Sequence, residues 1–220
     1  MEYSHPDVKG VTQVPPGEER VIEYIDGFNL YFGLKEKAWT KYYWLDLAKL
    51  AKSLLSSDQR LVRTKYFTSK ISNLAAKRKR QQTYLSALGT LPDFEIHFGR
   101  YQTFVQTCMK CGHKRLDSNE KRTDVNIATH MLVDAFQGHF DTAILISADR
   151  DLTAPIAEIR RLFPSRLVKV AFPAGRFSLE LQSVAPISFQ SYEGKLRKSL
   201  LPDRITLSSG YVVEKPATWT

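Results

Sequence analysis

The hydrophobic positions of the chain fall into two alternating patterns, one typical of buried strands and one typical of helices. Short apolar runs predict strands at 21–26, 61–67, 94–105, 142–147, 166–172 and 186–192. Helical spacing of apolar residues predicts a helix that begins near Leu30 and further helices at 44–55, 72–89, 124–136 and 152–163. Because strands and helices alternate, we expect an α/β fold, a three-layer sandwich with a mostly parallel central sheet flanked by helices.

The composition of the segments suggests where this domain begins and ends. Residues 1–20 are rich in Pro, Gly and charge, which predicts a flexible N-terminal leader. We expect one domain over 21–192, with a loop that contains both cysteines at 106–119. Residues 193–220 predict an extended tail that packs on the domain or on a neighbouring subunit and has no catalytic part.

Acidic and polar side chains stand where the predicted strands end and where a predicted helix begins. These residues are Asp26, Asn29, Asp124, Ser147, Asp149 and Asp151. Ligands of parallel α/β sheets bind where the loops converge, at the carboxyl ends of the strands. Each aspartate alone is more commonly a turn residue or a helix cap, and Asp151 could simply cap the helix that follows. Their recurrence at separate strand ends favours a shared site.

Carboxylates gathered at one edge repel each other unless a cation or raised pKa values relieve the repulsion. Mg²⁺ or Mn²⁺ prefers such oxygen ligands, and a divalent ion can activate water for attack on a phosphodiester. The chain has 32 Lys and Arg against 23 Asp and Glu, a net charge of +9. This balance favours a polyanionic partner, with nucleic acid ahead of an anionic membrane surface.

The segment 149–153, DRDLT, also fits the signature of haloacid-dehalogenase-type phosphatases. In that alternative Asp149 is the nucleophile and Asp151 the general acid or base. The signature would stand near the start of such a domain, whereas here only about seventy residues follow it and they contain no acidic pair. We therefore rank the phosphatase below a nuclease.

Three blocks of the sequence resemble the signatures of NYN-domain proteins, a PIN-like ribonuclease group that includes the bacterial LabA-like proteins. The blocks are VIEYIDGFNLYFGL, NEKRTDVNIATHMLVDAF and DTAILISADRDLTAPIAEI, and the resemblance covers about residues 20–190. It implies a PIN-like, Rossmann-like fold whose acidic cluster binds Mg²⁺ or Mn²⁺ and cleaves RNA. The residues that match the family's motifs are Asp26, Asn29, Asp124, Ser147, Asp149 and Asp151. One departure is Ala148, which stands where the family more often has glycine.

The two cysteines form a C-x-x-C pair, Cys108 and Cys111, with His113 two positions further on. These residues could supply part of a tetrahedral structural zinc site, completed by His97, by His130 or by a second chain. The alternative is two free thiols in a surface loop. A redox pair is less favoured, because the motif does not begin a helix.

Basic residues concentrate in the predicted helix at 72–89 and around the cysteine loop. They are Lys77, Arg78, Lys79 and Arg80, followed by Lys110, Lys114, Arg115, Lys121 and Arg122. A charge run is commonly a solvated helix face, but these residues could also contact RNA phosphates, with Tyr42, Tyr43 or Trp44 stacking on bases.

The sequence therefore predicts a metal-dependent ribonuclease whose partner is RNA, with a non-catalytic RNA-binding or regulatory module as the alternative. No apolar run approaches the roughly 18 residues of a membrane helix, and the N-terminus lacks the order of a signal peptide. We expect a cytoplasmic protein without a membrane partner, and a homo-oligomer is compatible with the sequence.

Overall fold

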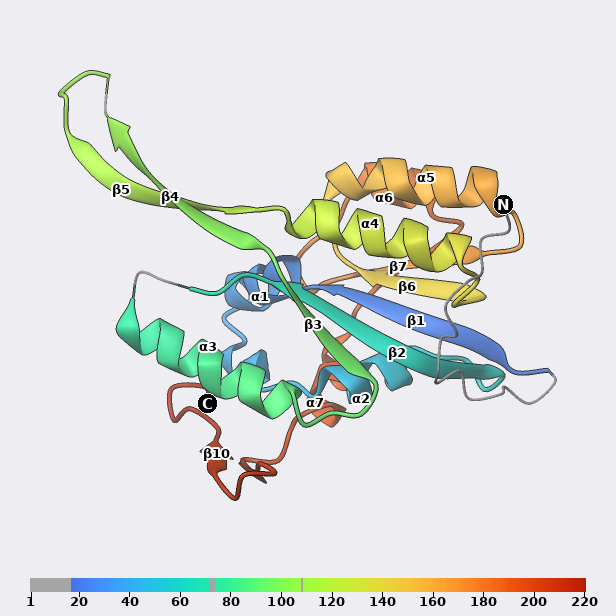
Figure 1. Cartoon of the computed structure of the whole chain (residues 1–220), viewed down its shortest axis with the longest axis horizontal. Helices are drawn as coiled ribbons and strands as arrows, with labels where there is room; N and C mark the ends of the chain where they lie inside the picture. The colour runs from blue at the N-terminus through green and yellow to red at the C-terminus, as the bar shows by residue number, and fades with distance from the viewer. Residues whose placement is uncertain (1–16, 72–73, 108) are drawn as a thin grey trace, which may run out of the picture.

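The computed structural model describes residues 17–71, 74–107 and 109–220. Its centre is a six-stranded sheet with the order β3-β2-β1-β6-β7-β8, in which all neighbouring strands run parallel (Figure 1). The strands are β1 (Glu19–Asp26), β2 (Gln59–Thr68), β3 (Phe94–Phe98), β6 (Thr142–Ile146), β7 (Leu167–Phe172) and β8 (Ile187–Gln190). The predicted parallel sheet is confirmed, and each of its six strands lies within or overlaps a predicted strand.

Helices cover both faces of this sheet. One face carries α1 (Gly27–Glu36), the short 3-10 helix η1 (Thr40–Tyr43), α2 (Leu47–Ser53), α3 (Ala75–Leu88) and α7 (Glu193–Lys198). The other carries α4 (Thr123–Phe136), the 3-10 turn η2 (Arg150–Leu152), α5 (Thr153–Leu162) and α6 (Leu179–Val184). The three-layer α/β prediction is therefore confirmed. None of the helices in the described ranges is long and apolar enough to cross a membrane.

Strand β1 is buried on both faces, as its continuous apolar run predicts. Val21 and Ile25 pack into the core beneath α1, α2 and α3, whereas Ile22 and Tyr24 pack into the core beneath α4, α5 and α6. Successive side chains of a strand point to opposite faces, so one strand joins the two cores. This central position fixes the end of β1 and the side chain of Asp26.

The segment 94–105, predicted as one strand, divides at Gly99. Residues before the glycine form β3 in the central sheet, and residues after it form β4 (Arg100–Thr107). Strand β4 pairs antiparallel with β5 (Lys114–Lys121), and the pair projects from the domain as a hairpin arm (Figure 1). Residues 114–119 had been expected in the loop 106–119. These residues show no alternation of apolar side chains, so their sequence did not predict a strand. The strand forms by main-chain pairing with β4.

The C-terminal segment 193–220 is only partly extended. It begins with α7 and continues with the antiparallel pair β9 (Arg204–Thr206) and β10 (Val212–Glu214). Leu196 and Val213 are buried in the core, and Trp44 Nε1 donates a hydrogen bond of 2.8 Å to the Pro202 carbonyl. At the other end of the chain, residues 1–16 of the predicted leader lie outside the described residues, and Glu19 already belongs to β1.

Candidate active site

The ends of β1 and β6 bring two of the predicted site residues into contact. The strands are adjacent and parallel with Ile25 opposite Ile146, so the next residue on each, Asp26 and Ser147, leaves the sheet at the same edge. Ser147 Oγ donates a hydrogen bond of 2.8 Å to Asp26 Oδ2. From β1 the chain builds the sheet outward on one side through β2 and β3, and it then builds the other side outward through β6, β7 and β8. Asp26 therefore lies at the topological switch point, where ligands of such sheets bind.

Asp26 is buried and accepts four hydrogen bonds. Its Oδ1 accepts from the main-chain N–H groups of Phe28 and Asn29, at 3.1 and 3.0 Å, and so caps the N-terminus of α1. Its Oδ2 accepts from Asn29 Nδ2 at 2.7 Å and from Ser147. The interpretation of Asp26 as a helix cap and its interpretation as a site residue are compatible, because the cap fixes where the carboxylate lies.

The electrostatics of Asp26 reflect two opposing influences. Burial raises the pKa of Asp26 above its usual value, hydrogen bonds from Asn29 and Ser147 lower it, and the nearby charge of Asp149 raises it again. The net direction is upward. A nearby cation would reverse this direction, because it would favour the ionised carboxylate.

Ser147 also links Asp26 to Asp149, since its Oγ accepts a hydrogen bond of 3.0 Å from the Asp149 main-chain N–H. Asp149 is half-buried, and its Oδ1 accepts at 3.1 Å from the N–H of Asp151. The capping bond after β6 is thus made by Asp149, and the side chain of Asp151 is exposed. The suggestion that Asp151 caps the following helix is wrong, because the N-cap of α5 is Leu152 and no side chain makes a capping hydrogen bond there.

Asp124 is the second residue of α4 and is half-buried. It does not cap the helix, whose N-cap is Arg122 in the left-handed region with φ of 79°. Within residues 17–71, 74–107 and 109–220, no group of three His, Cys, Asp or Glu side chains lies close enough to hold a metal ion. Hydrogen bonds thus join Asp26, Asn29, Ser147 and Asp149, and among the described residues the side chains of Asp124 and Asp151 lie outside this set.

The chemistry of the joined residues suits a hard divalent cation. Asp26, Asp149, Ser147 and Asn29 offer carboxylate, hydroxyl and amide oxygens, and Mg²⁺ is commonly held by one or two carboxylates together with water. The mutual charge effect between Asp26 and Asp149 is the repulsion that such an ion would relieve. By donor type, the edge fits Mg²⁺ or Mn²⁺ and not zinc.

Arg176 is a site residue that the sequence interpretation missed. Its Nη1 donates a hydrogen bond of 3.3 Å to Asn29 Oδ1, and its Nη2 forms an ion pair of 2.6 Å with Glu36. The residue follows β7, so the strand-end rule could have found it. Arginine is the side chain best suited to recognise phosphate, and Arg176 lies beside the acidic edge.

Of the predicted zinc ligands, the structure describes Cys111 and His113 but not Cys108. Cys108 lies outside the described residues, and Cys111 is an exposed free thiol near His113, in the turn that joins β4 to β5. His97 and His130 instead pack on each other, with ring centroids 4.1 Å apart, beside the central sheet. The described geometry gives no support to either histidine as the fourth ligand.

The predicted RNA-binding cations divide between α3 and the hairpin arm, both at the end of the sheet where β1 meets α1 (Figure 1). Lys77 and Arg80 line a cavity, whereas Arg78 and Lys79 are exposed on α3. The arm carries exposed cations, and Arg122 is exposed where the arm joins α4. The described cations of the turn and adjoining strand are Lys110 and Lys114. Arg115 and Lys121 lie in β5.

The cavity beside α1 has a volume of about 670 Å³ and is lined by α1, η1, β2, α3 and the C-terminal residues Thr218 and Trp219. Tyr43 contributes to its wall. The expectation that Trp44 stacks on bases is wrong, because Trp44 is completely buried in the core. Tyr42 lines the cavity, but it is almost fully buried and its hydroxyl donates to Glu193 Oε1 at 2.7 Å.

Comparison with known proteins identifies the class to which this fold and edge belong. The profile of the NYN domain matches residues 20–193, which is most of the chain. The protein therefore belongs to the NYN-domain family, a group of PIN-like nucleases, and this membership supports a ribonuclease-type function.

The individual proteins that are similar to this chain include the following two. One is 6-hydroxy-3-succinoylpyridine 3-monooxygenase HspA of Pseudomonas putida, 29% identical over 171 residues, which are 62% of this chain and 54% of that protein. The chain thus spans about half the length of this curated relative. The other is a crystal structure of a protein of unknown function from Vibrio parahaemolyticus, with a TM-score of 0.53 and 18% identity over 86% of this chain and all of that one. The second likeness concerns the fold alone.

Proposed function

We propose that the protein hydrolyses phosphodiester bonds of RNA at the edge formed by Asp26, Ser147 and Asp149, with Mg²⁺ or Mn²⁺ as its cofactor. The observation that carries the proposal is the hydrogen-bonded link from Asp26 through Ser147 to Asp149 at the switch point of the sheet. The link ties the Asp26 carboxylate at the end of β1 to the main chain of Asp149 in the turn after β6. Membership of the NYN family supports the same reaction class.

Asp26 and Asp149 are the residues that would hold the cation, and we propose Asp124 and Asp151 as weaker, outer contributors. When bound, a divalent ion supplies charge for the developing oxyanions and lowers the pKa of water. Asn29 and the main chain of α1 hold the Asp26 carboxylate in a fixed orientation. Such fixed orientation supports catalysis because the charges need no rearrangement during the reaction.

Ser147 positions both carboxylates, since its hydroxyl donates to one and accepts from the main chain of the other. We propose that Arg176 binds a phosphate oxygen of the substrate, because its guanidinium already lies within hydrogen-bond distance of Asn29. The net charge of +9 would attract the polyanionic strand. The cations of α3 and the hairpin arm would hold the flanking phosphates.

The test compares the purified protein with three aspartate variants on a labelled single-stranded RNA, in Mn²⁺, in Mg²⁺ and in EDTA. Asp26→Asn and Asp149→Asn keep the side-chain shape but remove the charge, and we expect cleavage to fall by about 10²-fold or more. Asp58→Asn is the matched control, because Asp58 is exposed and precedes β2 at the opposite edge of the sheet. Its cleavage rate should equal that of the wild type.

Two other outcomes would replace the proposal. If no RNA is cut in any metal while RNA still binds, the protein is a non-catalytic RNA-binding module. Release of phosphate from p-nitrophenyl phosphate, with a covalent intermediate on Asp149, would instead indicate a haloacid-dehalogenase-type phosphatase. Mn²⁺-dependent cleavage that Asp149→Asn leaves unchanged would remove the acidic edge from the mechanism.

A further inference from the structure

The cavity beside the acidic edge has the chemistry of a nucleotide-binding subsite. We propose that it takes one nucleotide of the RNA substrate, with the base against its aromatic wall and the phosphate among its cations. This inference rests on the proposed ribonuclease function, because it assigns the place of a nucleotide next to the bond that is cut. The volume of the cavity, about 670 Å³, is within the range of small-molecule sites.

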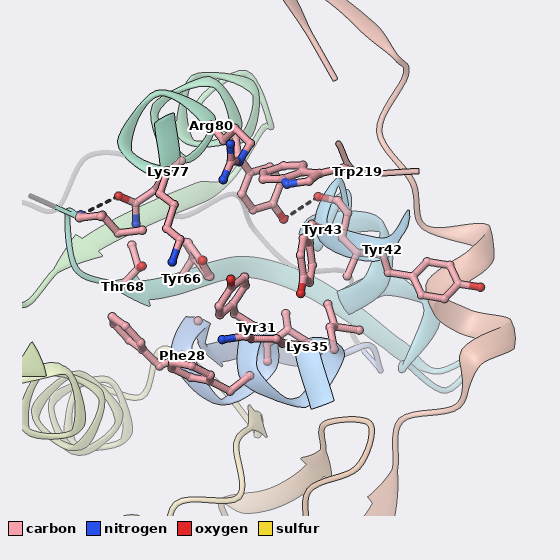
Figure 2. Close-up of a pocket in the computed structure, with 18 of the residues that line it drawn as sticks. Phe28, Tyr31, Lys35, Tyr42, Tyr43, Tyr66, Thr68, Lys77, Arg80 and Trp219 are labelled. Atoms are coloured by element: carbon pink, nitrogen blue, oxygen red, sulfur yellow. Dashed lines mark hydrogen bonds between the residues drawn. The ribbon is translucent and has the colours of Figure 1, made fainter. Parts of the chain in front are cut away.

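Aromatic rings form much of the cavity wall. Tyr31 and Tyr43 lie with ring centroids 5.0 Å apart, and Tyr66 borders the same space from β2 (Figure 2). Trp219 closes the wall from the C-terminal segment, with its centroid 5.7 Å from that of Tyr43 and 6.0 Å from that of Tyr84. Flat π-faces of this kind bind bases by stacking, whatever the base identity.

The charges of the cavity complement a phosphate. Lys35, Lys77 and Arg80 line it, and Figure 2 shows the amino groups of Lys35 and Lys77 directed toward the space that the tyrosines border. The described lining residues include no Asp or Glu. An anionic group would thus meet cations from α1 and from α3 without a competing carboxylate. An uncharged aromatic ligand would not require these cations.

The cavity adjoins the acidic edge at the start of α1. Its lining begins with Gly27 and Phe28, the two residues that follow Asp26. A Cβ at Gly27 would lie 2.7 Å from atoms of the Tyr66 ring, so α1 starts in direct contact with the cavity wall. The charge of Asp26 also contributes to raising the pKa of Tyr66 to about 12, although burial is the main cause. A nucleotide held here would lie against the start of α1, which directly follows Asp26.

The polar groups of the cavity indicate that base identity is read weakly. Gln81 is already engaged, since its Oε1 accepts from the Ile71 N–H and its Nε2 donates to the Ser69 carbonyl, both at 2.8 Å. Thr68 is hydrogen-bonded to Tyr66. With these groups occupied, recognition would depend on stacking and charge, and purine and pyrimidine nucleotides should bind comparably.

Binding of nucleoside monophosphates in EDTA tests the inference separately from cleavage. Isothermal titration with 5′-AMP and 5′-UMP should give saturable binding to the wild-type protein. Trp219→Ala should weaken it by roughly tenfold, the loss expected for one base–aromatic stack, and Lys77→Ala should weaken it as well. Trp219→Phe keeps an aromatic face and should retain most of the affinity.

Two matched controls lie outside the cavity lining. Tyr211→Ala removes an exposed aromatic ring of the same C-terminal segment, and Lys49→Ala removes an exposed cation of α2. Both should bind the nucleotides as the wild type does. A thermal unfolding curve for each variant shows whether its fold is intact.

The inference is overturned if neither nucleotide binds, if both bind but Trp219→Ala and Lys77→Ala have no effect, or if only an aromatic acid such as nicotinate binds. The last result would point to a small-molecule site. Nucleotide binding by a protein that never cuts RNA would contradict the proposed function but still make the cavity a nucleotide-binding site. RNA cleavage without nucleotide binding would do the reverse.

Discussion

Buried carboxylates occur in two regions of this protein, the middle of the sheet and its carboxyl edge, and their surroundings differ. Glu23 and Asp26 lie three positions apart on β1 and both are buried. Neither oxygen of Glu23 has a hydrogen-bond partner among the described residues, whereas Asp26 accepts four hydrogen bonds. Burial raises the pKa of Glu23 well above 4.5, which favours its neutral form.

Asp134 on α4 is a third buried carboxylate, and it is neutralised by a cation. Lys65 Nζ and the Tyr24 hydroxyl each donate to Asp134 Oδ2 at 2.6 Å. Burial alone would raise the pKa of Asp134, but hydrogen bonds from Lys65, Tyr24 and His139 outweigh it, and the net shift is downward.

Within the described part of the chain, no ion pair joins Asp26 or Asp149 to a Lys or Arg. Buried charge is costly unless it is neutralised or well hydrogen-bonded. In the middle of the sheet, Glu23 meets this requirement by favouring its protonated form, and Asp134 meets it through its ion pair with Lys65. At the edge, hydrogen-bond donors orient Asp26, and no described Lys or Arg forms an ion pair with it or with Asp149.

The largest effect on stability should come from breaking the pair in the middle of the sheet. Lys65→Met leaves the buried Asp134 without its cation, and we expect it to lower the free energy of unfolding by about 3–5 kcal/mol. Urea unfolding measures this loss. Cleavage per folded molecule should stay unchanged, and a specific loss of cleavage would show that the two regions are not separate.

Ser147→Ala should lower both stability and cleavage, because the hydroxyl serves the fold and the edge. Removing it leaves Asp26 with one hydrogen bond fewer and should cost about 1–3 kcal/mol. Ser147→Thr retains a hydroxyl and provides the comparison. If the alanine variant unfolds earlier but cuts RNA at the wild-type rate, Ser147 has a structural role only.

Glu23→Gln should alter the pH dependence of stability. Because the folded pKa of Glu23 is raised, its contribution to stability is fully present below about pH 4.5 and is lost as the pH rises toward the folded pKa. The slope from this group can reach about 1.4 kcal/mol per pH unit. Between pH 4 and 8, the free energy of unfolding should change less with pH in the variant than in the wild type. The same pH dependence in both proteins would contradict the assignment.

The smallest effect should follow from Asp151→Asn. The side chain is exposed, and the capping bond in this turn is made by Asp149. We expect cleavage within about threefold of the wild-type rate, a change of less than 1 kcal/mol in the activation barrier. A loss as large as that of Asp149→Asn would make Asp151 a primary ligand.

Much of the fold could be predicted, because β1 and β6 are continuous apolar runs whose ends mark one edge of the sheet. The same rule places Asp26 beside Ser147. Strand β5 could not be predicted, since its sequence is polar and lacks the apolar alternation of a half-buried strand, although it pairs with β4. Trp219 lines the cavity because it packs against Tyr43 and Tyr84, which lie more than a hundred positions away in the sequence. No local sequence pattern predicts such a contact.

The most direct test of the account compares Asp26→Asn with Glu23→Gln in one assay of Mn²⁺-dependent RNA cleavage. Both variants replace a buried acid of β1 by the corresponding amide, so they differ chiefly in where that acid lies. The account predicts that Asp26→Asn loses cleavage by about 10²-fold or more while Glu23→Gln, at equal folded concentration, cuts at the wild-type rate. Normal cleavage by Asp26→Asn would contradict it.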